Sequence, residues 1–162
     1  MTRRAALALG VATTVALAAP APGALASRAR VAPCSPRVHK GLLPVWMRGG
    51  FGPGTRITYE VGRHGAIGAV LWNKPLNAPP AKHESNKILW VPRHPSKSVA
   101  PLWIKMQRMD GTRLVGAPVR RIITTGPGPS LVDAPSAGCW RLTLTWSGRR
   151  DTLDLSYVPP TD

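Results

Sequence analysis

Alternation of apolar and polar residues is the dominant pattern of the chain after residue 42. The clearest run is "CWRLTLTW" (139–146), in which tryptophan and leucine alternate with cysteine, arginine and threonine. Side chains two positions apart in a β-strand point to the same face of the sheet. The run therefore predicts a strand whose apolar face covers a core, with these inward residues: Trp140, Leu142, Leu144 and Trp146.

A second strand is predicted directly after it, so that the two form a C-terminal hairpin. The segment "SGRRD" (147–151) supplies turn residues, and "TLDLSYV" (152–158) alternates again, with Leu153, Leu155 and Tyr157 facing inward. Pro159 and Pro160 end the strand because proline has no backbone N–H to donate.

Another hairpin is predicted in "PLWIKMQRMDGTRLVG" (101–116), where Asp110 and Gly111 are residues that tight turns favour. The same reasoning predicts further strands at residues 42–47, 56–61, 87–91 and 120–125. Residues 66–72, "AIGAVLW", are continuously apolar, which fits a buried strand and also an irregular segment.

Helix signals are nearly absent from this part of the chain. The 18 prolines and 16 glycines of the sequence interrupt helical periodicity. Residues 73–83 and 126–138 are rich in proline and are predicted loops. Residues 42–162 therefore predict an all-β domain, an immunoglobulin-like antiparallel sandwich of about seven to eight strands. A small barrel is the alternative.

The N-terminus has the pattern of a secretory signal peptide. Arg3 and Arg4 precede an apolar run of about 15 residues, which is short for a bilayer span, and Ala24 and Ala26 offer the small residues of a cleavage site. We expect residues 1–26 to be removed and residues 27–41 to form a segment that carries Cys34. The mature protein is then secreted or held at the extracellular cell surface, without a transmembrane segment. An uncleaved anchor is the alternative.

The two cysteines, Cys34 and Cys139, favour a disulfide in an exported chain. The bond would close a loop of about 105 residues. A zinc site needs about four ligands, and neither a CxxC nor an HxxxH spacing occurs. A nucleophilic cysteine needs a nearby base and a cleft, whereas Cys139 is expected on the polar face of its strand. The sequence therefore predicts a disulfide and no metal site.

The other titratable residues give no catalytic pattern. Asp151 and Asp154 are expected on opposite faces of a strand, so no pair of carboxylates suited to hydrolysis is predicted. His83, with Glu84 and His94, is the one set that a turn could bring to a metal, and solvated loop histidines are the simpler interpretation. No nucleophile elbow, phosphate loop or dinucleotide motif is present. We expect no enzymatic activity and no cofactor.

Six tryptophans stand beside one phenylalanine. Trp103 falls on the same strand face as Lys105, so it is expected to be exposed, and an exposed tryptophan beside basic groups can hold a sugar, a peptide or a partner protein. Trp90 is the second aromatic candidate. The candidate binding residues are therefore Trp103, Lys105 and Trp90; the alternative is that these side chains cap a small core.

The chain is strongly basic, with a formal net charge of +15, or about +13 after removal of the predicted signal peptide. The basic residues are spread along the chain instead of being clustered as in nucleic-acid-binding proteins. This charge predicts salt-sensitive attraction to polyanions and no specific nucleic-acid site.

Four segments carry a family resemblance: "VWMRGGFGPGTRI", "NKILWVPR", "LWIKMQRMDGTRL" and "DAPSAGCWRLTLTWSGRRDTLDLSYV". Together they resemble an uncharacterised family of small secreted immunoglobulin-like β-sandwich proteins of high-GC Gram-positive bacteria, whose C-terminal hairpin carries P-x-x-G-C-W. The resemblance implies the fold and export, and no catalytic residues. The position of Asp133, six residues before Cys139, resembles that of the corner before strand F of immunoglobulin domains, although no tyrosine occupies the expected place.

Together these features predict an exported, non-catalytic and monomeric module. It binds a protein or a cell-envelope glycan, or it has a structural role. One alternative is a proteinase-inhibitor-like module that presents residues 73–83 or 126–138. Another is an electrostatic binder of anionic cell-wall polymer or nucleic acid, whose affinity would fall steeply with salt.

Overall fold

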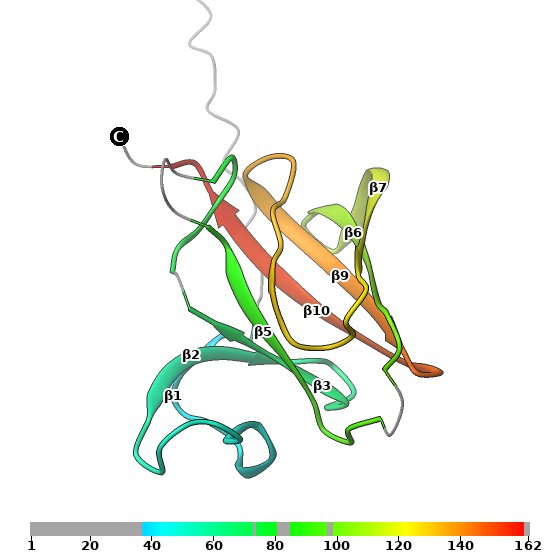
Figure 1. Ribbon diagram of the computed structural model, residues 1–162. Coiled ribbons are helices and arrows are strands. Elements are labelled where there is room, and N and C mark those ends of the chain that lie inside the picture. Colours follow the sequence, from blue (N-terminus) through cyan, green and yellow to red (C-terminus); the bar gives the residue numbers. More distant parts are fainter. Residues whose placement is uncertain (1–36, 73, 81–84, 97–98, 161–162) are drawn as a thin grey trace, which may run out of the picture. The chain divides into compact units, whose positions relative to one another are not determined.

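The computed structural model describes residues 37–72, 74–80, 85–96 and 99–160. The predicted signal peptide, Cys34, His83 and Glu84 lie outside these residues. Within them the chain forms ten β-strands in two five-stranded sheets, together with one short 3₁₀ helix (Figure 1). The fold is an all-β sandwich, as the sequence predicts. Three short strands are not predicted: His39–Leu42, near the start of the described chain, and Leu76–Asn77 and Pro129–Leu131, inside the predicted loops.

The first sheet, called sheet A here, has the strand order β1-β2-β3-β5-β8. All neighbouring strands in it are antiparallel. Three of its strands lie where alternation or a continuous apolar run predicts them: β2 (Arg56–Val61), β3 (Ile67–Leu71) and β5 (Lys87–Pro92). Every residue of β3 is buried, so the centre of the apolar run at 66–72 is a buried strand and not an irregular segment. The other two strands of the sheet are β1 (His39–Leu42) and β8 (Pro129–Leu131).

The second sheet, sheet B, has the order β4-β10-β9-β6-β7. Its strands are β4 (Leu76–Asn77), β6 (Leu102–Asp110), β7 (Arg113–Ile123), β9 (Gly138–Trp146) and β10 (Arg149–Val158). The strand β4 runs parallel to β10, and the other neighbours are antiparallel. In chain order, β5, β6, β8, β9 and β10 take the places of strands B, C, E, F and G of an immunoglobulin sandwich, in which B lies beside E and F lies between C and G.

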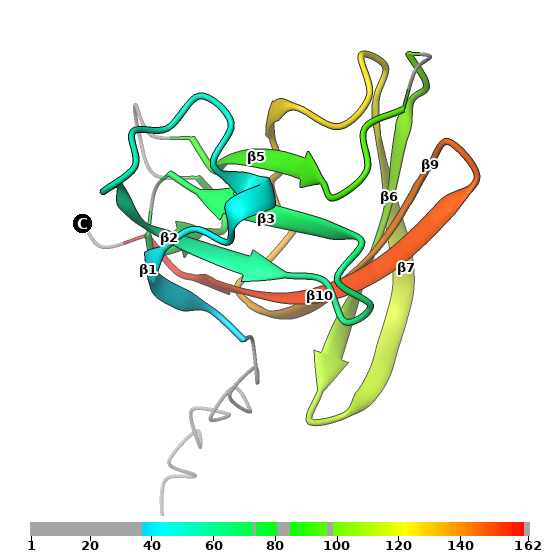
Figure 2. The same cartoon turned by 90° about the horizontal axis from the view of Figure 1, so that it is seen from below.

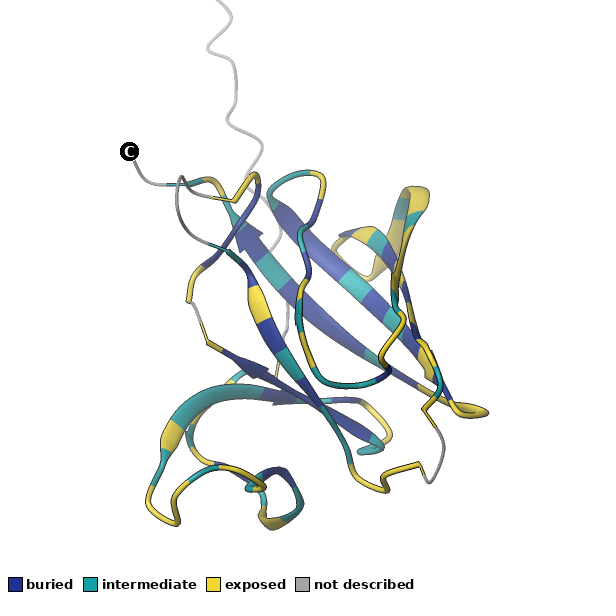
Figure 3. Ribbon diagram, viewed as in Figure 1, coloured by how far each residue is buried: buried dark blue, intermediate teal, exposed yellow. Residues whose placement is uncertain are grey.

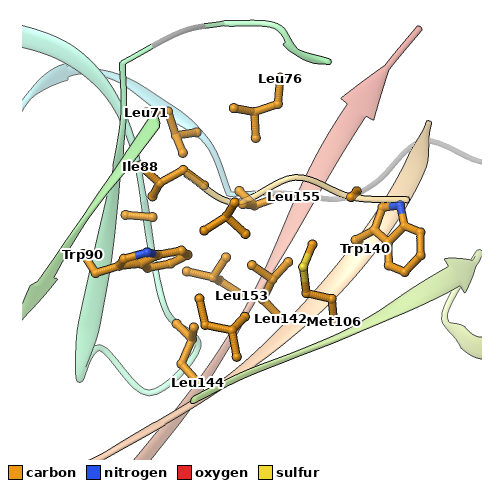
Figure 4. Close-up of a cluster of buried hydrophobic side chains, with 14 of the residues drawn as sticks. Leu71, Leu76, Ile88, Trp90, Met106, Trp140, Leu142, Leu144, Leu153 and Leu155 are labelled. Atoms are coloured by element: carbon orange, nitrogen blue, oxygen red, sulfur yellow. The ribbon is translucent and has the colours of Figure 1, made fainter. Parts of the chain in front are cut away.

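The main core fills the space between the two sheets. Sheet A contributes Ile88 and Trp90 to it, and sheet B contributes the predicted inward residues of the C-terminal hairpin (Figure 4). Trp140, Leu142, Leu144 and Trp146 are all buried, as are Leu153, Leu155 and Tyr157. The alternation in this hairpin therefore predicts the core correctly. The turn is shorter than predicted, because Trp146 pairs with Arg149 and only Ser147 and Gly148 lie between the strands.

A smaller apolar cluster covers the outer face of sheet A. Its buried members are Leu43, Met47 and Val70. Met47 belongs to the 3₁₀ helix η1 (Val45–Met47), which lies against the outside of β3 (Figure 2). The predicted strand at 42–47 is therefore wrong. Pro44 precedes the helix with φ −51°, and it has no N–H for a ladder, so the chain leaves strand geometry at this point.

The two sheets are joined at one edge by a buried aspartate. Asp151 of β10 is fully buried, and its carboxylate accepts hydrogen bonds from the backbone N–H groups of His64 (3.0 Å), Ala66 (2.8 Å) and Thr152 (2.7 Å). The turn between β2 and β3 is thereby fixed to sheet B. Gly62 is needed beside it, because a Cβ atom there would lie 2.3 Å from the Asp151 carboxylate.

Strand β4 and the buried Asn86 connect the predicted loops to the core. Asn86 accepts a hydrogen bond from Asn77 N–H and donates to the Asn77 carbonyl, both at 2.8 Å, and it also donates to Asp133. Tyr157 donates to the Val132 carbonyl at 2.8 Å, so a tyrosine of β10 holds the connection that carries Asp133. The predicted loops at 73–83 and 126–138 are therefore partly inside the sandwich, where they contain β4 and β8.

Strand β7 is the exposed edge of sheet B, and most of its residues are exposed (Figure 3). The strand predicted separately at 120–125 belongs to the second half of β7, since β7 is one strand from Arg113 to Ile123. A register shift opposite Gln107 accommodates Gly116 and Pro118. Such irregularities, with arginines along the strand, hinder pairing with a further strand.

Cys139 is the second residue of β9 and is buried, although it belongs to neither apolar cluster. Its Sγ lies 3.9 Å from Met109 Sδ on β6. Because Cys34 lies outside the described residues, the Cys34–Cys139 disulfide stays a prediction. Among the residues that the structure describes, no helix has the length and apolar character needed to cross a bilayer.

Candidate functional site

The register of sheet B gathers one aromatic and three basic side chains on its outer face. Trp103 lies between Ile122 on β7 and Thr145 on β9. One step along the strands, Lys105 lies between Arg120 and Thr143. Side chains of directly paired residues stand about 5 Å apart on the same face. Arg150 on β10 lies opposite Thr145 and completes the set. Residues from four strands therefore meet on one surface, which we call the basic face: Trp103, Lys105, Arg120, Thr143, Thr145 and Arg150.

The basic face contains a hollow of about 250 Å³. Trp103 is 50% exposed there. The other lining residues are hydroxyl-bearing, basic or aliphatic, and none is acidic: Ile104, Lys105, Arg120, Thr143, Thr145 and Arg150. An exposed indole beside three cations and two hydroxyls can stack against an apolar ring face while it binds negative groups.

The predicted binding residues divide between the outer face of sheet B and the core between the sheets. Trp103 and Lys105 lie together on the basic face, as their shared strand face predicts. Trp90 is only 1% exposed, belongs to the main core, and donates its indole N–H to Ser130 Oγ at 2.9 Å. Trp90 is therefore a core residue and not part of a binding surface. In the segment "KILWV" Ile88 and Trp90 share the inward face of β5.

A second polar cluster lies at the open edge of β10, where Asp154 holds two arginines. Arg63 Nη2 lies 2.7 Å from Asp154 Oδ2, and Arg141 contacts both carboxylate oxygens at 2.8 and 3.0 Å. Burial raises the pKa of the Asp154 carboxyl, but the hydrogen bonds from Arg141 and Arg63 outweigh it, and the pKa lies below its usual range. Asp154 is therefore an anion that two cations neutralise.

Glu60 of β2 lies beside this cluster and is only 3% exposed. Its Oε1 accepts a hydrogen bond from the backbone N–H of Asp154 at 3.2 Å, and its Oε2 has no hydrogen-bond partner within the described part of the chain. Burial raises the pKa of Glu60 to about 7, with the Asp154 charge adding to the effect and Lys74 opposing it. A hollow of about 250 Å³ opens here, lined by Arg37, Glu60, Val61, Arg63 and Asp154.

The histidines within the described ranges do not form a metal site. His39 stacks on Tyr59 with ring centroids 5.1 Å apart, and His64 Nδ1 lies 3.2 Å from Asp151 Oδ1. Across residues 37–72, 74–80, 85–96 and 99–160, no three His, Cys, Asp or Glu side chains are placed to share an ion. The set of His83, Glu84 and His94 is not described as a group, because its first two members lie outside these ranges.

The sequence does not predict the contributions of Arg120, Arg150, Thr143 and Thr145 to the basic face, nor the position of Glu60 beside Asp154. Both arrangements come from strand pairings and sheet contacts between residues far apart in the chain, such as the 94 positions that separate Glu60 from Asp154. The polar face of "CWRLTLTW" is the one signal for the two threonines.

Comparison of the chain with protein-family models, with curated proteins and with solved structures found no match. The resemblance to small secreted sandwich proteins therefore stays a prediction. The geometry of the two hollows, one on the basic face and one beside Glu60, is therefore the basis for assigning a function.

Proposed function

We propose that this protein is an exported, non-catalytic binding module that holds an anionic glycan of the cell envelope on its basic face. The observation that carries the proposal is the half-exposed Trp103 in a hollow with Lys105, Arg120 and Arg150 and no lining acid. Three of the seven acidic residues, Glu60, Asp151 and Asp154, are buried. Burial of these acids leaves the surface still more basic, which attracts polyanions over a distance of about 10 Å at moderate salt.

A glycan fits this surface better than a general polyanion does. Tryptophan offers a flat apolar face for the C–H groups of a sugar ring, and hydroxyls such as those of Thr143 and Thr145 both donate and accept hydrogen bonds. Lysine and arginine then bind the carboxylate or phosphate groups of the polymer. Attraction by net charge alone would make no use of an indole at the centre of the cations.

The inhibitor hypothesis has less support. It needs a protruding loop at residues 73–83 or 126–138. The described parts of these segments contain buried residues, Leu76 and Asn77 in one and Val132 and Ala134 in the other. Residues that belong to a sandwich core are not available to enter a protease active site.

Replacing Trp103 with alanine is expected to weaken binding of a polyuronate at least about tenfold, because the central aromatic residue of a binding surface supplies a large share of the affinity. Isothermal titration of the purified protein against polygalacturonate, with uncharged dextran as the comparison polymer, measures the change. Trp72→Ala is the matched control, because Trp72 is 45% exposed but directly follows β3 of the other sheet. Equal loss in both variants, or no loss in either, contradicts the proposal.

The charges of the basic face should act locally as well as through the net charge. Lys105→Glu is expected to reduce polyuronate binding more than Lys87→Glu does, although both change the net charge equally. Lys87 lies with its Nζ 5.7 Å from the Trp72 ring centre, away from the basic face. Titrations at low and physiological salt check this. If the two variants lose the same affinity at both salts, binding follows net charge and has no specific site.

A further inference from the structure

We propose that the hollow at the open edge of β10 binds a small zwitterion, of the class of free α-amino acids, between Glu60 and the arginines Arg37 and Arg63. This site is separate from the basic face, and the proposal does not depend on the glycan. Its basis is an unpartnered carboxylate oxygen, nearly completely buried, in a hollow whose other charged lining residues include two guanidinium groups.

The carboxyl group of Glu60 is held in place without being fully satisfied. Oε1 accepts the Asp154 N–H, which fixes the side chain against β10, while Oε2 has no partner among the described residues. A buried polar atom without a hydrogen bond destabilises the folded state, because it has lost its water and gained no partner. A ligand that brings an N–H donor to Oε2 removes this cost, and a positively charged donor gains the most from an ionised carboxylate.

The other charged groups around the hollow favour a negative group on the same ligand. Asp154 is neutralised by Arg63 and Arg141, so this triad carries a net positive charge. A guanidinium has five N–H donors, and the contact with Asp154 uses the Nη2 of Arg63. Arg37, at the start of the described chain, supplies the second guanidinium in the lining. The ligand therefore needs an ammonium group for Glu60 and a carboxylate for the arginines.

The protonation of Glu60 makes such binding depend on pH. With a pKa of about 7 in the folded protein, Glu60 is mostly protonated at pH 6 and ionised at pH 8. The charged groups that act on it are Asp154 on β10 and Lys74 before β4, and the backbone N–H of Arg37 also favours its ionised form. Asp154 in turn is paired with Arg63 and with Arg141 on β9. An ammonium group prefers ionised Glu60, so the affinity should fall about tenfold from pH 8 to pH 6.

The test is isothermal titration of the purified protein with glycine, acetate and methylammonium at pH 8 and pH 6. We expect glycine to bind at least about tenfold more tightly than either half-ligand, with the stated loss at pH 6. Glu60→Gln should weaken glycine binding at pH 8 and remove its dependence on pH. Arg37→Gln should weaken glycine binding at both pH values but keep the pH dependence, because it changes only the group for the carboxylate.

Several outcomes would overturn the proposal. Acetate binding as tightly as glycine would identify an anion site, and equal binding of methylammonium would identify a cation site. Glycine binding that Glu60→Gln leaves unchanged, or no heat with any of the three compounds, would show a hollow filled by water. Asp110→Asn, at an exposed turn between β6 and β7, is the charge-matched control for Glu60→Gln. Thermal unfolding of each variant checks that loss of binding is not loss of the fold.

Discussion

Asp151→Ala is expected to lower the free energy of unfolding by about 3–5 kcal/mol, because it leaves three backbone N–H donors without their acceptor and a cavity at a buried position. The carboxylate accepts the backbone N–H groups of His64, Ala66 and Thr152, and its residue is fully buried. For a domain of this size the loss corresponds to a fall of about 10–20 °C in the unfolding temperature. Urea unfolding followed by tryptophan fluorescence measures it.

Two further variants separate the role of the hydrogen bonds from that of the charge. Asp151→Asn keeps one acceptor oxygen, so its loss should be smaller than that of the alanine variant. Gly62→Ala should also destabilise the protein, since the new Cβ would displace the carboxylate from its donors. Asp110→Ala, which removes an exposed acidic side chain, should change the free energy by less than about 0.5 kcal/mol. A loss below about 1 kcal/mol for Asp151→Ala would show that the joint is not important for stability.

Loss of the predicted Cys34–Cys139 disulfide is expected to cost about 4–5 kcal/mol, because a bond that closes a loop of about 105 residues restricts the unfolded chain strongly. Cys34→Ala should therefore lower the free energy of unfolding by this amount. Cys139→Ala should lower it slightly further, since Cys139 is also buried beside Met109. Chemical denaturation with and without reductant measures both effects.

The double variant provides the control for the disulfide. If the two cysteines are bonded, the double variant loses about as much stability as Cys139→Ala alone, and reductant affects the native protein but not the variants. Additive losses in the double variant, or a native protein that is insensitive to reductant, would mean that the sulfurs are not joined. Mass spectrometry of the unreduced protein after proteolysis provides an independent check.

The parts of the fold that sequence predicts well are those with a repeating local pattern. Alternation places Leu142 and Leu155 in the core, and Gly111, with φ +57°, follows Asp110 in the predicted turn of the β6–β7 hairpin. The strand β4 and η1 are missed for physical reasons. β4 has two residues, too few to show alternation, and it exists because Tyr157 and Val158 pair with it. The apolar residues around Pro44 have the composition of a strand. Proline, however, has no N–H for a strand ladder, so the chain forms η1 there instead.

The candidate site is predicted only in part for the same reason. Trp103 and Lys105 are two positions apart, so their common face follows from strand geometry. Arg120 and Arg150 join them through the pairings of β6 with β7 and of β9 with β10, which no local pattern specifies. Trp90 is predicted as a binding residue but lies in the core. An aromatic residue in a short strand can face either solvent or a core, and only the packing of the second sheet decides between the two.

The last strand, β10, makes contacts with segments that lie much earlier in the chain, the turn after β2 and the strand β4. Residues of β10 pair with β9 and β4, and the Asp151 and Thr152 positions hold the turn after β2 through the N–H groups of His64 and Arg63. During synthesis, β4 and the turn between β2 and β3 must wait for about 80 to 90 further residues before these partners exist. A chain of this design cannot close into its native form until its C-terminal end has emerged, and such a delay would suit the export that the N-terminal sequence predicts.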